Sequence, residues 1–194
     1  MKPVVLAFSG PIASGKTTIA HAIAETLNWR FASFGDFVRK EAHRRQLESS
    51  RKVLQDLGNE IISQGWESFC QAVLVDSGWI CGQGLIIDGI RHIEGLETVR
   101  KLVSPVPTFL AFVQIDDQTR RARLHEKNIL KGRELKRIDT HDTERQVKGI
   151  LEGVADVIVD GALPVEITVR DLIIWLAIQS REETEKKEKA STQY

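Results

Sequence analysis

Residues 10–17, GPIASGKT, decide the fold of this chain. They fit the pattern GxxxxGK[ST], in which two glycines, a lysine and a hydroxyl stand at fixed offsets. The segment follows a continuous apolar run at residues 4–8, which is typical of a strand buried on both faces. Apolar residues then recur with helical spacing over residues 16–27. A strand, a glycine-rich turn and a helix start therefore predict a loop that cradles phosphate groups.

Each position of this loop has a physical role in that interpretation. The glycines let the backbone N–H groups turn inward, and the helix N-terminus adds partial positive charge. Lys16 is expected to reach the β- and γ-phosphates, the Thr17 hydroxyl to ligate Mg²⁺, and Thr18 to donate to the α-phosphate. ATP and Mg²⁺ are thus the expected cofactors. The residues expected to bind ATP in the loop are Gly10, Pro11, Ile12, Ala13, Ser14, Gly15, Lys16, Thr17 and Thr18.

Asp88 is the expected acidic partner of the loop. It stands in the segment LIIDGIR, residues 85–91, where it ends an apolar run. Proteins with such a loop place a carboxylate at the end of a neighbouring strand, where it holds Mg²⁺ through water. The plain alternative is an aspartate that makes a turn at a strand end. We expect Asp88 to be a catalytic residue and a water-mediated metal ligand.

Strand and helix patterns alternate along the chain. This order predicts an α/β fold, the three-layer α/β/α fold of P-loop NTPases, with a five-stranded parallel sheet and a small lid. The expected strands are 4–8, 30–33, 85–88, 108–115 and 155–159. The expected helices with clear limits are 16–27, 35–47, 93–103, 118–127 and 142–153. One or two further helices begin at residue 49 or 50, where Gly58 and Gly65 weaken the helical pattern. A last helix has Pro164 near its first turn. Residues 1–180 form a single domain, and residues 181–194 form a charged flexible tail or a frayed helix end.

The composition limits the possible partners. The 194 residues suit one domain, and 27 Lys plus Arg balance 27 Asp plus Glu, so no basic excess favours a nucleic-acid partner. The apolar runs are shorter than the ~20 residues of a membrane span, which argues against a membrane protein. Cys70 and Cys81 fit no metal motif and are expected to be buried or half-buried hydrophobes in a reducing compartment. A cytoplasmic protein is the simplest interpretation.

The apolar face of the last helix leaves two interpretations open. Ile174, Trp175 and Ile178 widen this face. They either pack on the sheet or form a contact between two copies of the chain, so a homodimer is possible.

Other classes of nucleotide-binding protein fit less well. GTPases of the Ras type need an Asn-Lys-x-Asp motif that reads the base, and this sequence does not contain one. Large mechanochemical ATPases need a far longer chain. Small-molecule kinases remain, and these must hold a second substrate opposite the γ-phosphate.

Two segments resemble the adenylate-kinase-type nucleoside monophosphate kinases. GDFVR at residues 35–39 is similar to the Gly-Asp-x-x-Arg segment of that family. LIIDGIR at 85–91 resembles its Asp-Gly-Phe-Pro-Arg segment, but it is one residue shorter and lacks the proline. The resemblance implies that Arg39 and Arg91 bind the acceptor phosphate and that Asp36 organises their pocket. An arginine fork does fit a phosphate bidentately.

Further segments resemble two related groups of kinases. Residues 51–60, Trp66 and residues 87–100 are similar to viral-type deoxynucleoside monophosphate kinases. The IDGIR element, together with ADVIVDG at 155–161, also resembles dephospho-CoA-kinase-like nucleotide kinases. The resemblance covers roughly residues 4–178. It implies that acceptor-binding helices lie within about residues 35–76.

The charged segment after residue 115 gains a role from the same resemblance. Arg120 and Arg123 match an Arg-x-x-Arg pair that lies against the ATP base and phosphates, so both are expected to be catalytic and Arg120 to bind ATP. A lid at about residues 128–140 would close over ATP with its cations Lys131, Arg133 and Arg137. The plain alternative is the solvated face of a charged helix.

These features favour an ATP- and Mg²⁺-dependent kinase that phosphorylates a small nucleotide or nucleotide-like monophosphate. One alternative is a dephospho-CoA-type kinase with a hydroxyl acceptor, for which Asp36 would serve as the base. Another is a nucleotide-responsive ATPase switch or partner-binding protein. His92 is expected at the surface, and Trp66 in the core or an interface. The base, the sugar and the oligomeric state stay open.

Overall fold

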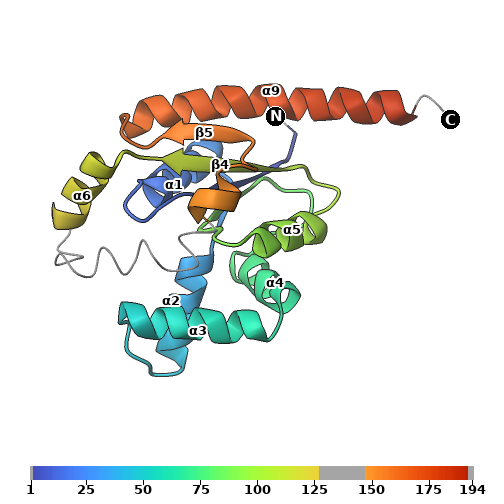
Figure 1. Cartoon of the computed structure of the whole chain (residues 1–194). Coiled ribbons are helices and arrows are strands. Elements are labelled where there is room, and N and C mark those ends of the chain that lie inside the picture. Colours follow the sequence, from blue (N-terminus) through green and yellow to red (C-terminus); the bar gives the residue numbers. More distant parts are fainter. Residues whose placement is uncertain (1, 127–146, 192–194) are drawn as a thin grey trace.

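The computed structural model describes residues 2–126 and 147–191 (Figure 1). Its centre is a five-stranded parallel sheet with the order β2-β3-β1-β4-β5. β1 pairs with β3, with Val5 opposite Leu85, and on its other side with β4, with Val5 opposite Thr108. The predicted sheet is thereby confirmed. The strands are β1 (Val5–Ser9), β2 (Arg30–Ser33), β3 (Leu85–Asp88), β4 (Thr108–Gln114) and β5 (Val157–Asp160).

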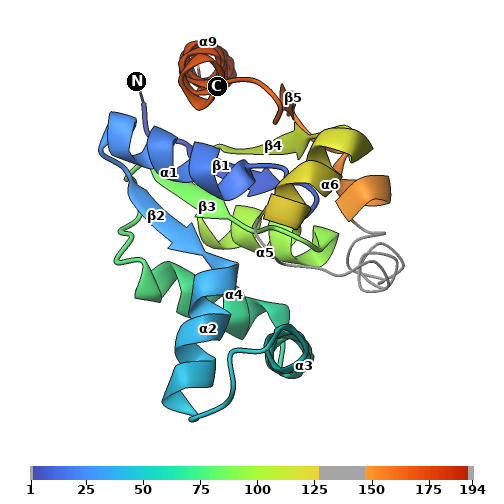
Figure 2. The same cartoon turned by 90° about the vertical axis from the view of Figure 1, so that its left-hand side faces the viewer.

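Side chains alternate between the two faces of the sheet, as the pleat of a strand requires. Leu6 and Phe8 of β1 pack with α1 (Lys16–Leu27) and α9 (Val165–Ser191). Val5 and Ala7 point the other way, into a second core formed by α2 (Phe34–Arg44), α3 (Arg51–Ser63), α4 (Trp66–Asp76) and α5 (Ile93–Leu102). Figures 1 and 2 show α9 on the opposite side of the sheet from α4 and α5. The three predicted layers are therefore present.

The helices after β2 lie farthest from α9 in both views (Figures 1 and 2). They are α2, α3 and α4. The next helix along the chain, α5, follows β3. The helical stretch after residue 50 is thus two helices, broken at Gly65, whose φ is 124°. Gly58 does not break it and lies inside α3. Phe69 of α4 contacts the rings of Phe34 and Phe37, which fastens α4 to α2.

In the second half of the chain, two predictions differ from the described structure and a third lies outside the described residues. After α6 (Asp117–Glu126), the described part of the helix expected over 142–153 contains a π-helix, η1 (Val147–Leu151), and residues 142–146 lie outside the described residues. β5 begins at Val157 rather than 155, because the Asp156 carboxylate accepts a hydrogen bond from the Leu110 backbone N–H just before the strand. The lid expected at 128–140, with Lys131, Arg133 and Arg137, also lies outside the described residues.

The charged C-terminal segment, expected to be a tail or a frayed helix end, belongs to the last helix. α9 continues through Ser191, and residues 192–194 lie outside the described residues. The segment is rich in Glu and Lys, which have high helix propensity, so it extends the helix that packs on the sheet.

The apolar side chains of α9 divide between core and surface. Trp175 packs edge-on against Phe109 of β4, with ring centroids 5.5 Å apart. Ile174 and Ile178 are exposed. Within residues 2–126 and 147–191, none of the helices is both long and apolar enough to cross a membrane.

Candidate functional site

The loop between β1 and α1 has a backbone that other side chains would disturb. Gly10 has a φ of 142°, and a Cβ at this position would lie 2.5 Å from the carbonyl oxygen of Val113 in β4. Ala13 and Gly15 also have positive φ angles, 65° and 96°, so the chain turns sharply just before α1 begins. Lys16 is the first residue of that helix, and its buried side chain lies back over the loop, with Nζ 3.4 Å from the carbonyl oxygen of Pro11.

Thr17 and Asp88 meet beside the loop. The Thr17 hydroxyl donates a hydrogen bond of 2.8 Å to Oδ2 of Asp88, which ends β3 and is only 5% exposed. The other carboxylate oxygen, Oδ1, is buried and has no hydrogen-bond partner among the described atoms. Such an oxygen carries a desolvation cost unless a further group satisfies it.

This orphaned oxygen fits a magnesium site. Mg²⁺ is usually bound through one or two carboxylates, several waters and the phosphates of the substrate. The described part of the chain contains no group of three or more His, Cys, Asp and Glu side chains that would form a cage of protein ligands. One hydroxyl and one carboxylate, Thr17 and Asp88, therefore match the sparse protein donor set that Mg²⁺ uses beside nucleotide phosphates.

Arg120 and Arg123 of α6 donate hydrogen bonds to the backbone of the loop. Arg120 is only 2% exposed, and its Nε donates to the carbonyl oxygen of Ile12 at 3.0 Å. Arg123 donates to the carbonyl oxygens of Ser14 at 3.1 Å and Gly161 at 2.9 Å. These bonds tie the loop to α6 and to the turn after β5. Contact of either guanidinium with ATP stays a prediction.

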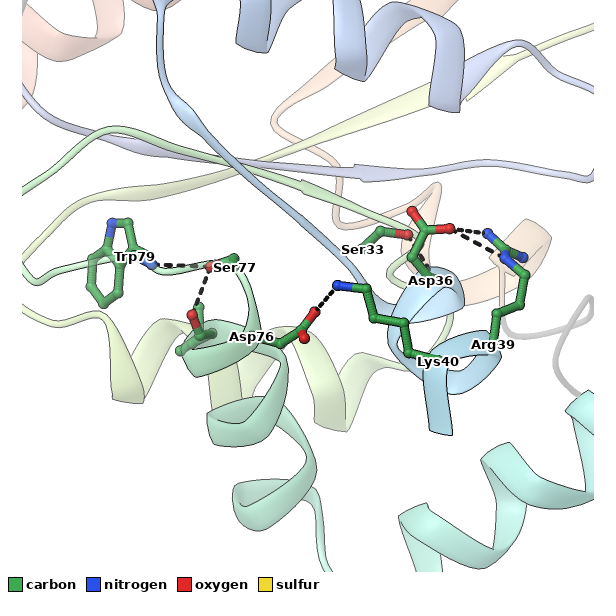
Figure 3. Close-up of polar contacts among 8 residues, drawn as sticks. Ser33, Asp36, Arg39, Lys40, Asp76, Ser77 and Trp79 are labelled. Carbon is green, nitrogen blue, oxygen red and sulfur yellow. Dashed lines mark hydrogen bonds and ion pairs between the residues drawn. The ribbon is translucent and has the colours of Figure 1, made fainter. Parts of the chain in front are cut away.

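Asp36 and Arg39 form an ion pair in the first turns of α2 (Figure 3). Oδ1 of Asp36 accepts hydrogen bonds from Nε of Arg39 at 3.2 Å and from Nη2 at 2.5 Å. Ser33 caps the helix by accepting a hydrogen bond from the Asp36 backbone N–H, which fixes the start of the turn. Lys40 donates to Asp76 at the end of α4, so α2 is held at a second point (Figure 3).

A single cavity of about 730 Å³ joins the loop to these helices. It brings Lys16, Thr17 and Asp88 together with the two arginines expected to bind the acceptor, Arg39 and Arg91. Its other lining residues are Ile12, Ser33, Phe34, Gly35, Val38, Ser49, Arg51, Leu54, Gln55, Gly58, Asn59, Ile62, Trp66, Phe69, Gly89, Ile90, His92 and Gly95.

Several expected site residues do not line this cavity. Asp36 contacts Arg39 but is not part of the lining. Arg120 and Arg123 bind the backbone of the loop and are also absent from the lining. Thr18 follows Thr17 on α1 and is exposed. Of the loop residues before Lys16, Ile12 alone is in the lining.

A family model described as an AAA domain matches residues 9–142, which is more than half of the chain. The chain belongs to this AAA domain family. The match includes the phosphate loop, the segment at 35–39 and the segment at 85–91, so the family covers both sides of the cavity. No curated protein matches the chain significantly.

Solved structures of kinases share the fold of this AAA domain. A provisionally assigned kinase from Chloroflexus aurantiacus has a TM-score of 0.63 at 17% identity, covering 93% of this chain and 97% of its own. The APS kinase of Mycobacterium tuberculosis, solved with AMPPNP and APS, has a TM-score of 0.60 at 15% identity, covering 91% and 98%. A gluconokinase from Sinorhizobium meliloti has a TM-score of 0.57 at 15% identity, covering 95% and 97%. At these identities the likeness establishes the fold alone.

Sequence reasoning missed part of the cavity of this AAA domain. His92, expected at the surface, lines it, as does Trp66, which also packs against the core as expected; their ring centroids are 5.1 Å apart. Gln55 and Asn59 of α3 also line it, although neither is among the expected site residues. Their spacing of four residues places both amides on one helix face, which is the signal in the sequence that could have found them.

A buried carboxylate links α2 to α3 beneath the cavity of the domain. Glu41 is 7% exposed and accepts hydrogen bonds from Arg44 at 2.8 and 2.9 Å and from Arg45 at 2.6 Å. Arg45 donates in turn to Glu60 of α3 at 2.8 Å. The hydrogen bonds from Arg44 and then Arg45 lower the pKa of Glu41 below its ordinary value of 4.5.

Proposed function

We propose that this protein is an ATP- and magnesium-dependent kinase that transfers a phosphoryl group to the phosphate of a nucleotide or nucleotide-like monophosphate. The observation that carries the proposal is the shared cavity. It is lined by Lys16, Thr17 and Asp88 from the phosphate loop and its partner strand, by Arg39 from α2, and by Arg91 from the segment after β3. A donor phosphate and an acceptor phosphate could therefore meet in one cavity.

The roles of these residues follow from the charges that such a reaction brings together. Lys16 would neutralise the β- and γ-phosphates, and Arg39 and Arg91 would hold the acceptor dianion in line with them. Positioning supplies most of what phosphoryl transfer requires, because little covalent chemistry falls to the protein. Thr17 and Asp88 would hold Mg²⁺, which when bound neutralises charge on the transferring phosphoryl group.

The position of Asp36 favours a phosphate acceptor over a hydroxyl acceptor. A hydroxyl needs a general base within hydrogen-bond reach, whereas a phosphate is already ionised. Asp36 accepts two hydrogen bonds from Arg39 through one carboxylate oxygen and does not line the cavity. We infer that Asp36 orients Arg39. An Asp36→Asn variant should then keep near-normal kcat with a raised KM for the acceptor, and a collapse of kcat would support a hydroxyl acceptor instead.

A panel of acceptors tests the proposal. ADP release from ATP and Mg²⁺ would be measured with nucleoside monophosphates, nucleosides, dephospho-CoA and gluconate, and with water alone. We expect nucleoside monophosphates to raise ADP release well above the rate in water, and Lys16→Ala to abolish the increase. If no acceptor raises the rate, the kinase proposal fails and a nucleotide-responsive switch becomes the better interpretation.

A further inference from the structure

Gly58 is an unexplained glycine in the middle of α3. Glycine lowers helix stability relative to alanine, so an interior glycine calls for a local reason. A Cβ at Gly58 would meet no described atom within 4 Å, and Gly58 lines the cavity. Packing within the described protein therefore does not explain this residue. A ligand that lies close against the helix backbone would explain it.

The side chains around Gly58 define the chemistry of such a ligand. Leu54 and Ile62, one helical turn on either side of Gly58, give this part of the cavity an apolar wall. Gln55 and Asn59 add two amide groups to the same lining. Each amide presents both a hydrogen-bond donor and an acceptor without a net charge.

Aromatic side chains face the same cavity from α2 and α4. Phe34 and Phe69 contact each other edge-on, and Trp66 stacks beside Phe69 with centroids 6.3 Å apart. Trp66 also lies tightly over α5, since a Cβ on Gly95 would come within 2.9 Å of its ring. The indole is thus held in place as a rigid wall.

We propose that the acceptor carries a nucleobase, which lies against the backbone of α3 at Gly58 and whose edge is read by the amides of Gln55 and Asn59. This inference deepens the proposed function and rests on it for the phosphate end of the acceptor. Aromatic and apolar walls fit the faces of a flat heteroaromatic ring, and paired amides fit its hydrogen-bonding edge. A sugar alone also has apolar C–H faces, but it has no flat heteroaromatic edge for the paired amides to read.

Equilibrium binding to Gly58→Ala tests the subsite without any need for turnover. The added methyl would occupy the space assigned to the ring, so we expect the Kd for nucleoside monophosphates to rise about 10-fold or more by calorimetry. The Kd for ATP should stay unchanged. The melting temperature should rise by about 2–4 °C, because alanine is the better helix former. Weaker binding by a more stable protein cannot be ascribed to misfolding.

A matched glycine and a truncated ligand provide the controls. Gly149 lies in η1 and is exposed, and a Cβ there would also meet no described atom within 4 Å, so Gly149→Ala should leave nucleotide binding unchanged. Ribose 5-phosphate keeps the phosphate and the sugar but lacks the base. Its affinity should be the same for the original protein and for Gly58→Ala.

The amides give an independent test. Asn59→Leu and Gln55→Leu keep the approximate size of the side chain but remove its hydrogen-bonding groups, so the kcat/KM ratios among the four common bases should shift by roughly 10- to 100-fold. Equal loss for nucleoside monophosphates and ribose 5-phosphate in Gly58→Ala, or no loss for either, would overturn the base subsite and leave the phosphate acceptor intact. Failure of every nucleoside monophosphate to bind the original protein would overturn the subsite as well. Binding without phosphoryl transfer would instead refute the proposed function alone.

Discussion

The hydroxyl of Thr17 and the carboxylate of Asp88 are joined by a hydrogen bond of 2.8 Å, although 71 positions separate them in the chain. The sheet explains their meeting. β3 lies directly beside β1, and Asp88 stands opposite Phe8 in the parallel register. The carboxyl end of β3 therefore opens beside the phosphate loop that follows β1, where a strand-end carboxylate can act together with the first turn of α1.

Asp88→Asn should reduce phosphoryl transfer while leaving the fold intact. The amide oxygen can still accept the hydrogen bond from Thr17, but the negative charge beside the loop is lost. We expect kcat to fall about 10²- to 10³-fold, as for loss of one strong electrostatic contact in an active site. A magnesium titration of ADP release would measure the effect. Asp160→Asn, at the exposed end of β5, is the matched control, and an unaltered magnesium dependence in Asp88→Asn would contradict the assignment.

Arg123→Ala should weaken nucleotide binding through the shape of the loop. Its guanidinium connects the carbonyl oxygens of Ser14 and Gly161, so the variant loses a brace between the loop and the turn after β5. We expect the affinities for ATP and ADP to fall together by about 10-fold, consistent with loss of hydrogen bonds from a charged donor. Calorimetry with both nucleotides would measure this.

The exposed Arg121 on the same helix gives the control for that experiment. Arg121→Ala should leave both affinities unchanged. A fall in kcat without any change in nucleotide affinity for Arg123→Ala would instead favour direct contact with the transferring phosphoryl group, which is the role that the family resemblance implies.

Local patterns explain why much of the fold could be predicted from the sequence. The predicted limits of α1, β2 and β3 agree with the structure, because their periodicity and their bounding residues lie within each segment. The approach of Asp88 to the loop was also predictable, since parallel strands align their carboxyl ends at one edge of a sheet. The helical structure of the charged end of α9 was not predictable, because its polar composition fits both a tail and a helix.

The cavity walls depend on contacts that no local pattern contains. Trp66 and His92 become neighbours only when α4 and α5 pack together. Gly58 weakened the prediction of a helix because its helix propensity is low. Gly58 lines the cavity, and the proposed base subsite would explain why a glycine stands inside this helix.

The two cysteines should differ in reactivity. Cys70 is buried in the core, and this burial raises the pKa of its thiol to about 12. Cys81 is exposed. A thiol reagent should therefore label one cysteine rapidly in the native protein and both after denaturation, because the thiolate is the reactive form. Loss of the rapid phase in Cys81→Ser would identify the labelled residue, and rapid labelling of two thiols in the native state would contradict the burial of Cys70.

Glu41→Gln should destabilise the acceptor side of the cavity in a pH-dependent manner. The charged carboxylate accepts hydrogen bonds from Arg44 and Arg45, and Arg45 holds Glu60 of α3. Because the folded-state pKa of Glu41 lies below its ordinary value of 4.5, its stabilising contribution is fully present above that value. The contribution is lost as the pH falls through the lower, folded-state pKa. The difference in unfolding free energy between the original protein and the variant should therefore be full at about pH 7 and shrink toward about pH 3.

The same variant should raise the KM for the acceptor more than the KM for ATP. The ion-pair chain from Glu41 through Arg45 to Glu60 holds α3, which carries Gln55 and Asn59, whereas the phosphate loop is braced from α6. Glu97→Gln, an exposed position on α5, should change neither KM value nor the pH profile. Denaturant unfolding at several pH values and steady-state kinetics would measure the two effects. A stability difference that stays constant from about pH 7 to about pH 3 would show that the charge of Glu41 is not what holds α2 to α3.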